Sequence, residues 1–175
     1  MNRSELELNG ALLEVAICCG IRMEFPDIHL IPNLLIKNDT LLRRKETQID
    51  VVAVSSSAIY VIEAKNWKCY IKGDPGDYQW TGMSSNLRVM NVFNPVLQNL
   101  YHVRLIKAHL VGNGVQMPPI YNLVCVPDQC EIRTQSKEVL PVSSIVPFIN
   151  SVEFFSKKHY DKNLMVKMIR RLCDQ

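Results

Sequence analysis

Residues 47–67 read TQIDVVAVSSSAIYVIEAKNW, which is two apolar runs joined by a serine-rich turn. Valine and isoleucine dominate the runs at 49–54 and 59–65, and residues 55–58 separate them, a pattern that predicts a β-hairpin. Successive residues of both runs are apolar, which is typical of central strands that are covered on both faces of a sheet. We therefore expect this hairpin to lie at the centre of a mixed β-sheet.

The predicted turn determines which residues of the hairpin face each other. If Ser56 and Ser57 form a two-residue turn, Asp50 pairs with Glu63, and Lys65 lies on the same face because side chains alternate along a strand. Directly opposed residues have Cβ atoms about 4.5–5.5 Å apart, so two carboxylates at these positions can share one divalent cation. Without a partner or a metal, such acids at the end of buried strands would be costly.

Spacing alone leaves two interpretations of this cluster open. In the first, Lys65 forms an ordinary ion pair with Asp50 or Glu63 at a strand end and has no chemical role. In the second, the two carboxylates bind Mg²⁺ or Mn²⁺, which oxygen-rich sites favour over zinc. The chemistry would then be hydrolysis, in which the cation lowers the pKa of a bound water and Lys65 positions that water.

Composition restricts the class of protein. The 175 residues are 47% apolar and 21% charged, which predicts one globular domain spanning residues 1–175. Twenty Lys+Arg against 17 Asp+Glu give a charge of +3, too small for a protein that binds nucleic acid through its total charge. We find no apolar run of membrane-spanning length and no signal peptide, and we expect the six cysteines to stay reduced. These features predict a cytoplasmic protein without a membrane partner.

The rest of the chain alternates predicted helices and strands. Proline near the first helical position and a later glycine predict a helix from Asn94 or Pro95 to about Leu110. Pro32 restricts the strand expected at 29–37 to an edge or bulged position. Helices are also expected at 4–21 and 158–172, a strand at 120–126, one or two short strands within 131–141, and irregular structure at 66–92. This order predicts an α/β fold with a mixed central sheet flanked by helices on both faces.

The hairpin, Trp80 and the stretch NPVLQNLYH at 94–102 together resemble the nuclease-related domain family, abbreviated NERD. The resemblance is strongest over residues 7–110, and residues 111–175 would complete the sheet and add a C-terminal helix. Because this family is grouped with the PD-(D/E)xK nucleases, the resemblance implies a restriction-endonuclease-like core. It also implies a metal-dependent nuclease that acts on DNA, and it leaves open a protein partner for targeting and a homodimer.

The family pattern assigns roles to individual residues. Asp50 stands for the strand aspartate of the family, and Glu63, Ala64 and Lys65 stand for its (D/E)xK element. The resemblance implies that Asp50, Glu63 and the backbone carbonyl of Ala64 hold Mg²⁺, with Mn²⁺ able to substitute. Lys65 would orient or activate water, and Gln98 on the following helix would lie near the metal.

Two departures from the family pattern concern the site. Ile49 replaces the proline of the superfamily's name. The N-terminal helix should supply a glutamate preceded by glycine, and neither Glu7 nor Glu14 follows a glycine. We expect Glu7 to be that residue, because Gly10 one turn later leaves space beside it, and Glu14 is the alternative. Otherwise either residue is an ordinary exposed helix glutamate.

Nucleic-acid contacts are expected from basic and aromatic residues close to the hairpin. Arg43, Arg44 and Lys68 are candidates for phosphate contacts, Trp67 for stacking on a base, and His102 for contact with a phosphate or the metal region. The alternatives are a solvated loop for the arginines, a core position for at least one tryptophan, and a partly buried structural histidine. The alternative to an enzyme is a catalytically silent module that binds nucleic acid or protein on the same fold.

Overall fold

The computed structural model describes residues 3–39, 44–67, 69–83 and 89–174, with side chains described for residues 11–36, 46–67, 69–83 and 89–173. The helices are α1 (Arg3–Glu24), α2 (Pro95–Gly112), α3 (Val142–Phe155) and α4 (Lys162–Arg170), which continues into a 3₁₀ turn at Arg171–Asp174. The strands are β1 (His29–Asp39), β2 (Arg44–Val54), β3 (Ile59–Ala64), β4 (Tyr70–Lys72), β5 (Gln79–Met83), β6 (Val89–Phe93), β7 (Ile120–Val126), β8 (Glu131–Arg133) and β9 (Val139–Pro141).

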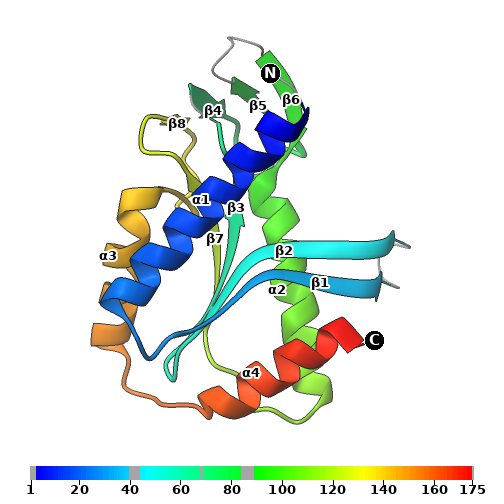
Figure 1. The fold of residues 1–175 in the computed structure, drawn as a ribbon, viewed down its shortest axis with the longest axis vertical. Coiled ribbons are helices and arrows are strands. Elements are labelled where there is room, and N and C mark those ends of the chain that lie inside the picture. Colours follow the sequence, from blue (N-terminus) through cyan, green and yellow to red (C-terminus); the bar gives the residue numbers. More distant parts are fainter. Residues whose placement is uncertain (1–2, 40–43, 68, 84–88, 175) are drawn as a thin grey trace.

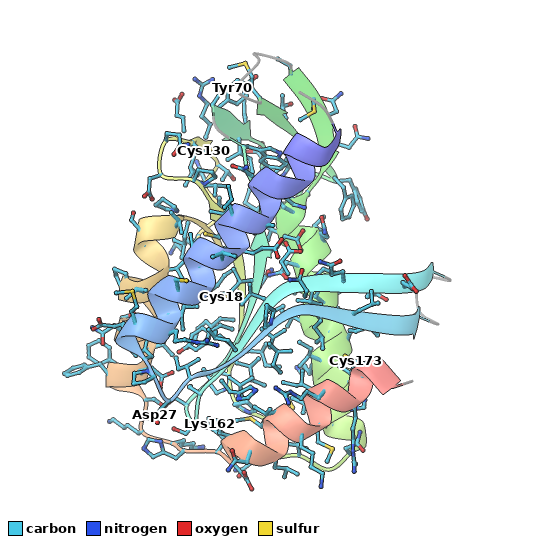
Figure 2. The ribbon with its side chains drawn as sticks, viewed as in Figure 1. Cys18, Asp27, Tyr70, Cys130, Lys162 and Cys173 are labelled. Atoms are coloured by element: carbon cyan, nitrogen blue, oxygen red, sulfur yellow. The ribbon has the colours of Figure 1, made fainter. Side chains whose placement is uncertain are left out.

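The strands form two sheets (Figure 1). The larger sheet has the order β1-β2-β3-β7-β9, antiparallel from β1 to β3 and parallel from β3 to β9, which confirms the predicted mixed sheet. The smaller sheet has the order β6-β5-β4-β8. It lies at one end of the molecule, near Tyr70 and Cys130, whereas Asp27 and Lys162 lie at the opposite end (Figure 2).

Helices cover both faces of the larger sheet. Residues of α1 and α3 pack against one face of β2 and β3, and residues of α2 and α4 pack against the other. Val51 and Ile62 belong to the first of these core clusters, whereas Val52 and Val61 belong to the second. The central strands are thus buried on both faces, as their uninterrupted apolar runs predict. The α/β fold class expected from the sequence is confirmed.

The β2–β3 hairpin has the predicted register. Val54 pairs with Ile59, and the Ser55 N–H donates to the Ala58 carbonyl over 3.0 Å, which leaves the next two serines as the turn residues. The Ser55 hydroxyl also accepts the Ala58 N–H over 2.9 Å. Because these short-range hydrogen bonds fix the turn, they also fix the pairing of every residue further along the two strands.

Strands β1 and β2 twist sharply at Asn33. This residue has a φ of 52°, in the left-handed region that asparagine tolerates better than most residues. Ile31 and Leu34 pack in the same core cluster, although residues three apart in a regular strand point to opposite faces. Ile49 and Val52 of β2 do the same. The pairing register is unchanged across the twist, so β1 is an edge strand without a bulge.

Helix α3 was not expected from the sequence. It contains Pro147 and several β-branched residues, which are unfavourable in a helix interior. Ile145 and Ile149, one turn apart, are buried against the sheet, so tertiary packing outweighs the local preference. The last helix is shorter than expected because it begins only at a cap, where the Asp161 carboxylate accepts the Leu164 N–H.

Residues 66–92, expected to be irregular, contribute most of the smaller sheet. Strands β4, β5 and β6 have only three to five residues each, too few for a hydrophobic period to be visible. Trp67 and Trp80 are buried together with Ile71 in a separate core cluster. A Cβ atom at Gly73 would lie 2.2 Å from the Trp80 ring, so glycine is required beside that ring.

No helix within the described part of the chain is long and apolar enough to cross a membrane. Cys125 and Cys130 are thiols buried among apolar residues. These two thiols act as small apolar side chains, which is the role expected for reduced cysteines.

Asn94 connects the smaller sheet to α2. Its fully buried side chain caps the helix by accepting the Val96 N–H (2.9 Å) and the Leu97 N–H (3.3 Å). Its amide donates to the backbone carbonyls of Pro75 (3.2 Å) and Asp77 (2.7 Å), which precede β5. Asn94 therefore caps α2, and the same side chain also fixes where the helix begins relative to the second sheet.

We predict that Asn94→Ala lowers the free energy of unfolding by about 1–2 kcal/mol, because it removes the cap and the amide that donates to the Pro75 and Asp77 carbonyls. Asn94→Asp keeps the acceptor and loses the amide donors, so its loss should be intermediate. Chemical denaturation measures both. The matched control is Asn113→Ala at the exposed end of α2, and an equal loss in that variant would contradict the assignment.

Candidate active site

Glu63 is a buried acid near the end of β3, with 2% of its surface exposed. Two donors converge on its Oε1 atom, since the Lys65 Nζ atom and the Gln98 Nε2 atom each lie 2.6 Å away. Lys65 directly follows β3, and Gln98 lies in the first turn of α2. Two separate elements therefore supply charge-assisted hydrogen bonds to one oxygen, and three residues predicted for the site lie in contact.

Asp50 lies in β2, at the position that the hairpin register places across from Glu63. Its Oδ2 atom accepts the backbone N–H of Ala64 over 2.8 Å. This hydrogen bond holds the carboxylate against the end of β3, next to the backbone of the (D/E)xK element. The twist of β1 and β2 falls at the same point of the sheet, so the acid sits where the strand changes direction.

The cluster formed by Asp50, Glu63 and Lys65 has more negative than positive groups. Burial raises the pKa of Glu63 to about 7, while the Lys65 ammonium opposes that rise and the Asp50 carboxylate adds to it. Burial also raises the pKa of Asp50, against the hydrogen bond from Ala64 and the charge of Lys65. One ammonium group therefore serves two largely buried carboxylates, and a further cation at this point would be favourable.

The second oxygen of Glu63 fits the role of a metal ligand. Its Oε2 atom is buried and accepts no hydrogen bond from the described residues, and the His102 Nδ1 atom lies 3.6 Å away. A buried acceptor without a partner costs about 1–3 kcal/mol, which coordination to a cation would offset. The ligands predicted from the sequence, the carboxylates of Asp50 and Glu63 and the carbonyl of Ala64, would all offer oxygen, the donor type that Mg²⁺ and Mn²⁺ prefer.

This donor set is small. Within the part of the chain that the structure describes, no three His, Cys, Asp or Glu side chains gather closely enough to hold a metal by themselves. Mg²⁺ commonly binds one or two carboxylates and keeps several waters, so two acids and a backbone carbonyl are sufficient for that ion.

Glu14 of α1 also faces the cluster. Its pKa is raised first by burial and then by the charge of Asp50, while a hydrogen bond with Asn33 lowers it. The Gln48 amide donates to the Asn33 Oδ1 atom over 2.8 Å, so Asn33 connects β2 to α1 beside the acids. Glu7 lies in α1 as well, but its side chain is outside the described residues.

Sequence analysis did not identify Asn33. The one available signal is an asparagine that follows a proline within an apolar strand, because asparagine is the residue that most often replaces glycine at a positive φ. The left-handed conformation turns β1 at the point where its side chain meets Glu14.

His102 is a buried residue beside the cluster. Its Nδ1 atom lies 3.6 Å from Glu63 and its Nε2 atom lies 3.5 Å from the Thr47 hydroxyl. With 2% of its surface exposed, it lies inside the protein, near the predicted metal ligands and away from the outer surface. This position favours a place near the metal region or a structural role for His102 over direct contact with a phosphate.

The other residues expected to contact nucleic acid are less well placed. Trp67 is 9% exposed and packs in the core of the smaller sheet, so its ring offers little surface to a base. Both tryptophans are buried, which agrees with the core alternative. Arg43 and Lys68 lie outside the described residues, and Arg44 lies in β2 with its side chain outside them. The roles of these three residues stay predictions.

Comparison with known proteins gave one finding. The family model described as "Nuclease-related domain" (NERD) matches residues 10–127, more than half of the chain. The matched segment contains Glu14, Asp50, Glu63 and Gln98, whereas Glu7 precedes it. No curated protein and no solved structure matches the chain.

We predict that the free energy of unfolding of the metal-free protein, measured in a chelator, falls as the pH rises from about 4.5 to about 7. The folded state keeps a proton on Glu63 in this range, whereas the unfolded state has released it, so folding is favoured at the acid end. A shift of this size corresponds to a change on the order of 3 kcal/mol in the free energy of unfolding. Denaturation in a chelator across this pH range measures it.

Glu63→Gln should remove most of this pH dependence, because the amide does not titrate. The matched control is Glu24→Gln, which changes an exposed glutamate at the end of α1 and should leave the dependence intact. A pH profile that Glu63→Gln leaves unchanged would show that another group controls the transition.

Proposed function

Because this chain belongs to the nuclease-related domain family, we propose that its carboxylate–lysine site hydrolyses phosphodiester bonds with a divalent cation, and that DNA is the substrate. The observation that carries the proposal is the state of Glu63, which offers a buried oxygen to a cation while Lys65 and Gln98 hold its other oxygen. The mixed α/β fold is consistent with a nuclease-like architecture.

The proposed roles follow from the contacts of each side chain. Asp50, Glu63 and the carbonyl of Ala64 would hold Mg²⁺, and Mn²⁺ would substitute for it. When bound, the cation lowers the pKa of a coordinated water and neutralises charge on the phosphate. Lys65 is 23% exposed, so its ammonium can reach a water at the mouth of the site while it stays bonded to Glu63. Gln98 keeps the Glu63 carboxylate in one orientation.

The family assignment supports a nuclease-related function in general. A simple ion pair at a strand end would leave Glu63 with Lys65 as its partner and would not explain the second donor, Gln98, which comes from α2. The amide of Gln98 brings no charge, so its contact serves orientation, which a reacting site needs more than a structural ion pair does.

The test is cleavage of supercoiled DNA, linear DNA, single-stranded DNA and RNA, each with magnesium, manganese or a chelator. We predict cleavage that requires the metal, and a loss of about 100-fold or more in rate for Glu63→Ala and for Lys65→Ala. Glu131→Ala, which changes an exposed glutamate of β8, is the control and should cleave as the unchanged protein does.

Two outcomes would contradict this function. Cleavage that survives both substitutions would mean a contaminating enzyme or a different site. Binding of nucleic acid in a chelator, with no cleavage in either metal, would identify the chain as a silent binding module.

We also propose Glu14, and not Glu7, as the helix glutamate of the site, because Glu14 interacts with Asp50 and lies in the matched segment. Glu14→Gln should lower the cleavage rate by about 10- to 100-fold and raise the magnesium concentration needed for half-maximal rate. Glu7→Gln is the matched control on the same helix and should behave like the unchanged protein. A larger loss for Glu7→Gln would reverse the assignment.

A further inference from the structure

A cavity of about 580 Å³ lies between β2 and α2, next to the carboxylates. Its walls include Thr47 and Gln48 from β2, Phe93 from the end of β6, and Leu97 and Tyr101 from α2. Its volume is within the range of roughly 300–1,000 Å³ that is usual for small-ligand sites. The proposed function does not use this cavity.

The outer wall of the cavity is aromatic. Phe93 is 53% exposed, which is unusual for so large an apolar ring. Its orientation follows from the pleat of β6, in which Val89, Asn91 and Phe93 are exposed while the two residues between them are partly buried. The strand therefore holds the ring at the surface beside the cavity, where it is available for stacking.

The inner wall of the cavity belongs to the active site. Gln98 and His102 both line it, and both contact Glu63, at 2.6 Å from Oε1 and 3.6 Å from Oε2 respectively. A group in the cavity is thus separated from the carboxylates by one side chain. A ligand that places a phosphate at Glu63 would place the group attached to that phosphate in or near the cavity.

The polar groups of the cavity favour a base over a phosphate. The Thr47 hydroxyl and the Gln48 amide are groups that hydrogen-bond to the edge of a base. Glu46 adds a negative charge at the rim, and no lysine or arginine is among the described residues of the lining. A flat, uncharged, partly polar ring fits both the aromatic and the amide surfaces of this cavity.

We infer that this cavity holds one unpaired nucleobase, stacked on Phe93, from the strand whose phosphate lies at Glu63. The inference rests on the proposed function for the position of that phosphate. Bases within a duplex are stacked and paired, so entry into the cavity requires an unpaired base. The substrate is therefore single-stranded nucleic acid, or a duplex at a point where it is locally open.

Binding tests this inference without requiring cleavage. A fluorescent oligothymidylate is titrated with the Lys65→Ala protein in magnesium, and anisotropy gives the Kd. Phe93→Ala in this background should weaken binding by about 5- to 30-fold, as expected for the loss of one stacked base. Phe93→Trp should keep most of the affinity, because it restores an aromatic surface. Phe154→Ala, which removes an exposed ring from α3, is the matched control and should have no effect.

A second oligonucleotide, which lacks bases, distinguishes binding of the base from binding of the sugar–phosphate backbone. An oligomer of abasic deoxyribose phosphates of equal length should bind more weakly, and Phe93→Ala should not weaken it further. A blunt duplex of the same length should also bind more weakly than the single strand. Equal affinity for thymidine and abasic strands, an unchanged Kd for Phe93→Ala, tighter binding of the duplex, or no binding of any strand would each overturn the inference.

The two hypotheses fail in different ways. Binding that depends on the base and on Phe93, without cleavage by the unchanged protein in either metal, supports the base site and removes the nuclease activity. Metal-dependent cleavage of single and double strands at equal rates, with no effect of Phe93→Ala on binding, supports the nuclease and overturns the base site.

Discussion

The buried carboxylate of Glu63 is the constraint on which the site depends. A charge at 2% exposure requires partners, and two elements deliver them: the end of β3 brings Lys65 and α2 brings Gln98, while β2 places the like charge of Asp50 nearby. Each partner reaches the carboxylate only if the hairpin keeps its register, because a slip of one residue would turn Glu63 to the other face. The serine turn therefore determines the electrostatics at the far end of the strands.

Two buried asparagine amides help to fix the position of α2. Asn94 ties the start of the helix to the loop before β5. One turn later, the Asn99 amide donates to the Val61 carbonyl (2.7 Å) and the Leu123 carbonyl (2.9 Å), which join the helix to β3 and β7. Gln98 is adjacent to this anchor, so its contact with Glu63 is held by hydrogen bonds on both sides.

The hairpin register was predictable from sequence because a short turn and two doubly apolar strands allow few alternatives. The acids, the lysine and the helix cap followed from that register and from local capping rules. The left-handed Asn33 and the helix α3 were not predictable, because each depends on packing between elements distant in the chain. The sequence also could not decide between Glu7 and Glu14. Helical periodicity shows which face of α1 is buried, but it does not show at which residue α1 crosses the sheet.

The total charge of +3 is compatible with a nucleic-acid substrate once the charges are placed. Acids form the floor of the site, and Asp50 and Glu63 outnumber the single ammonium that contacts them. The positive charge that a phosphate requires would then come mainly from the bound cation, so the chain itself need not be strongly basic. Two carboxylates with one ammonium make a bound cation favourable. Without the cation, the same shortage of positive charge makes folding costly, because the two carboxylates are held close together with little solvent. The arrangement that would favour a bound cation thus also reduces the stability of the metal-free fold.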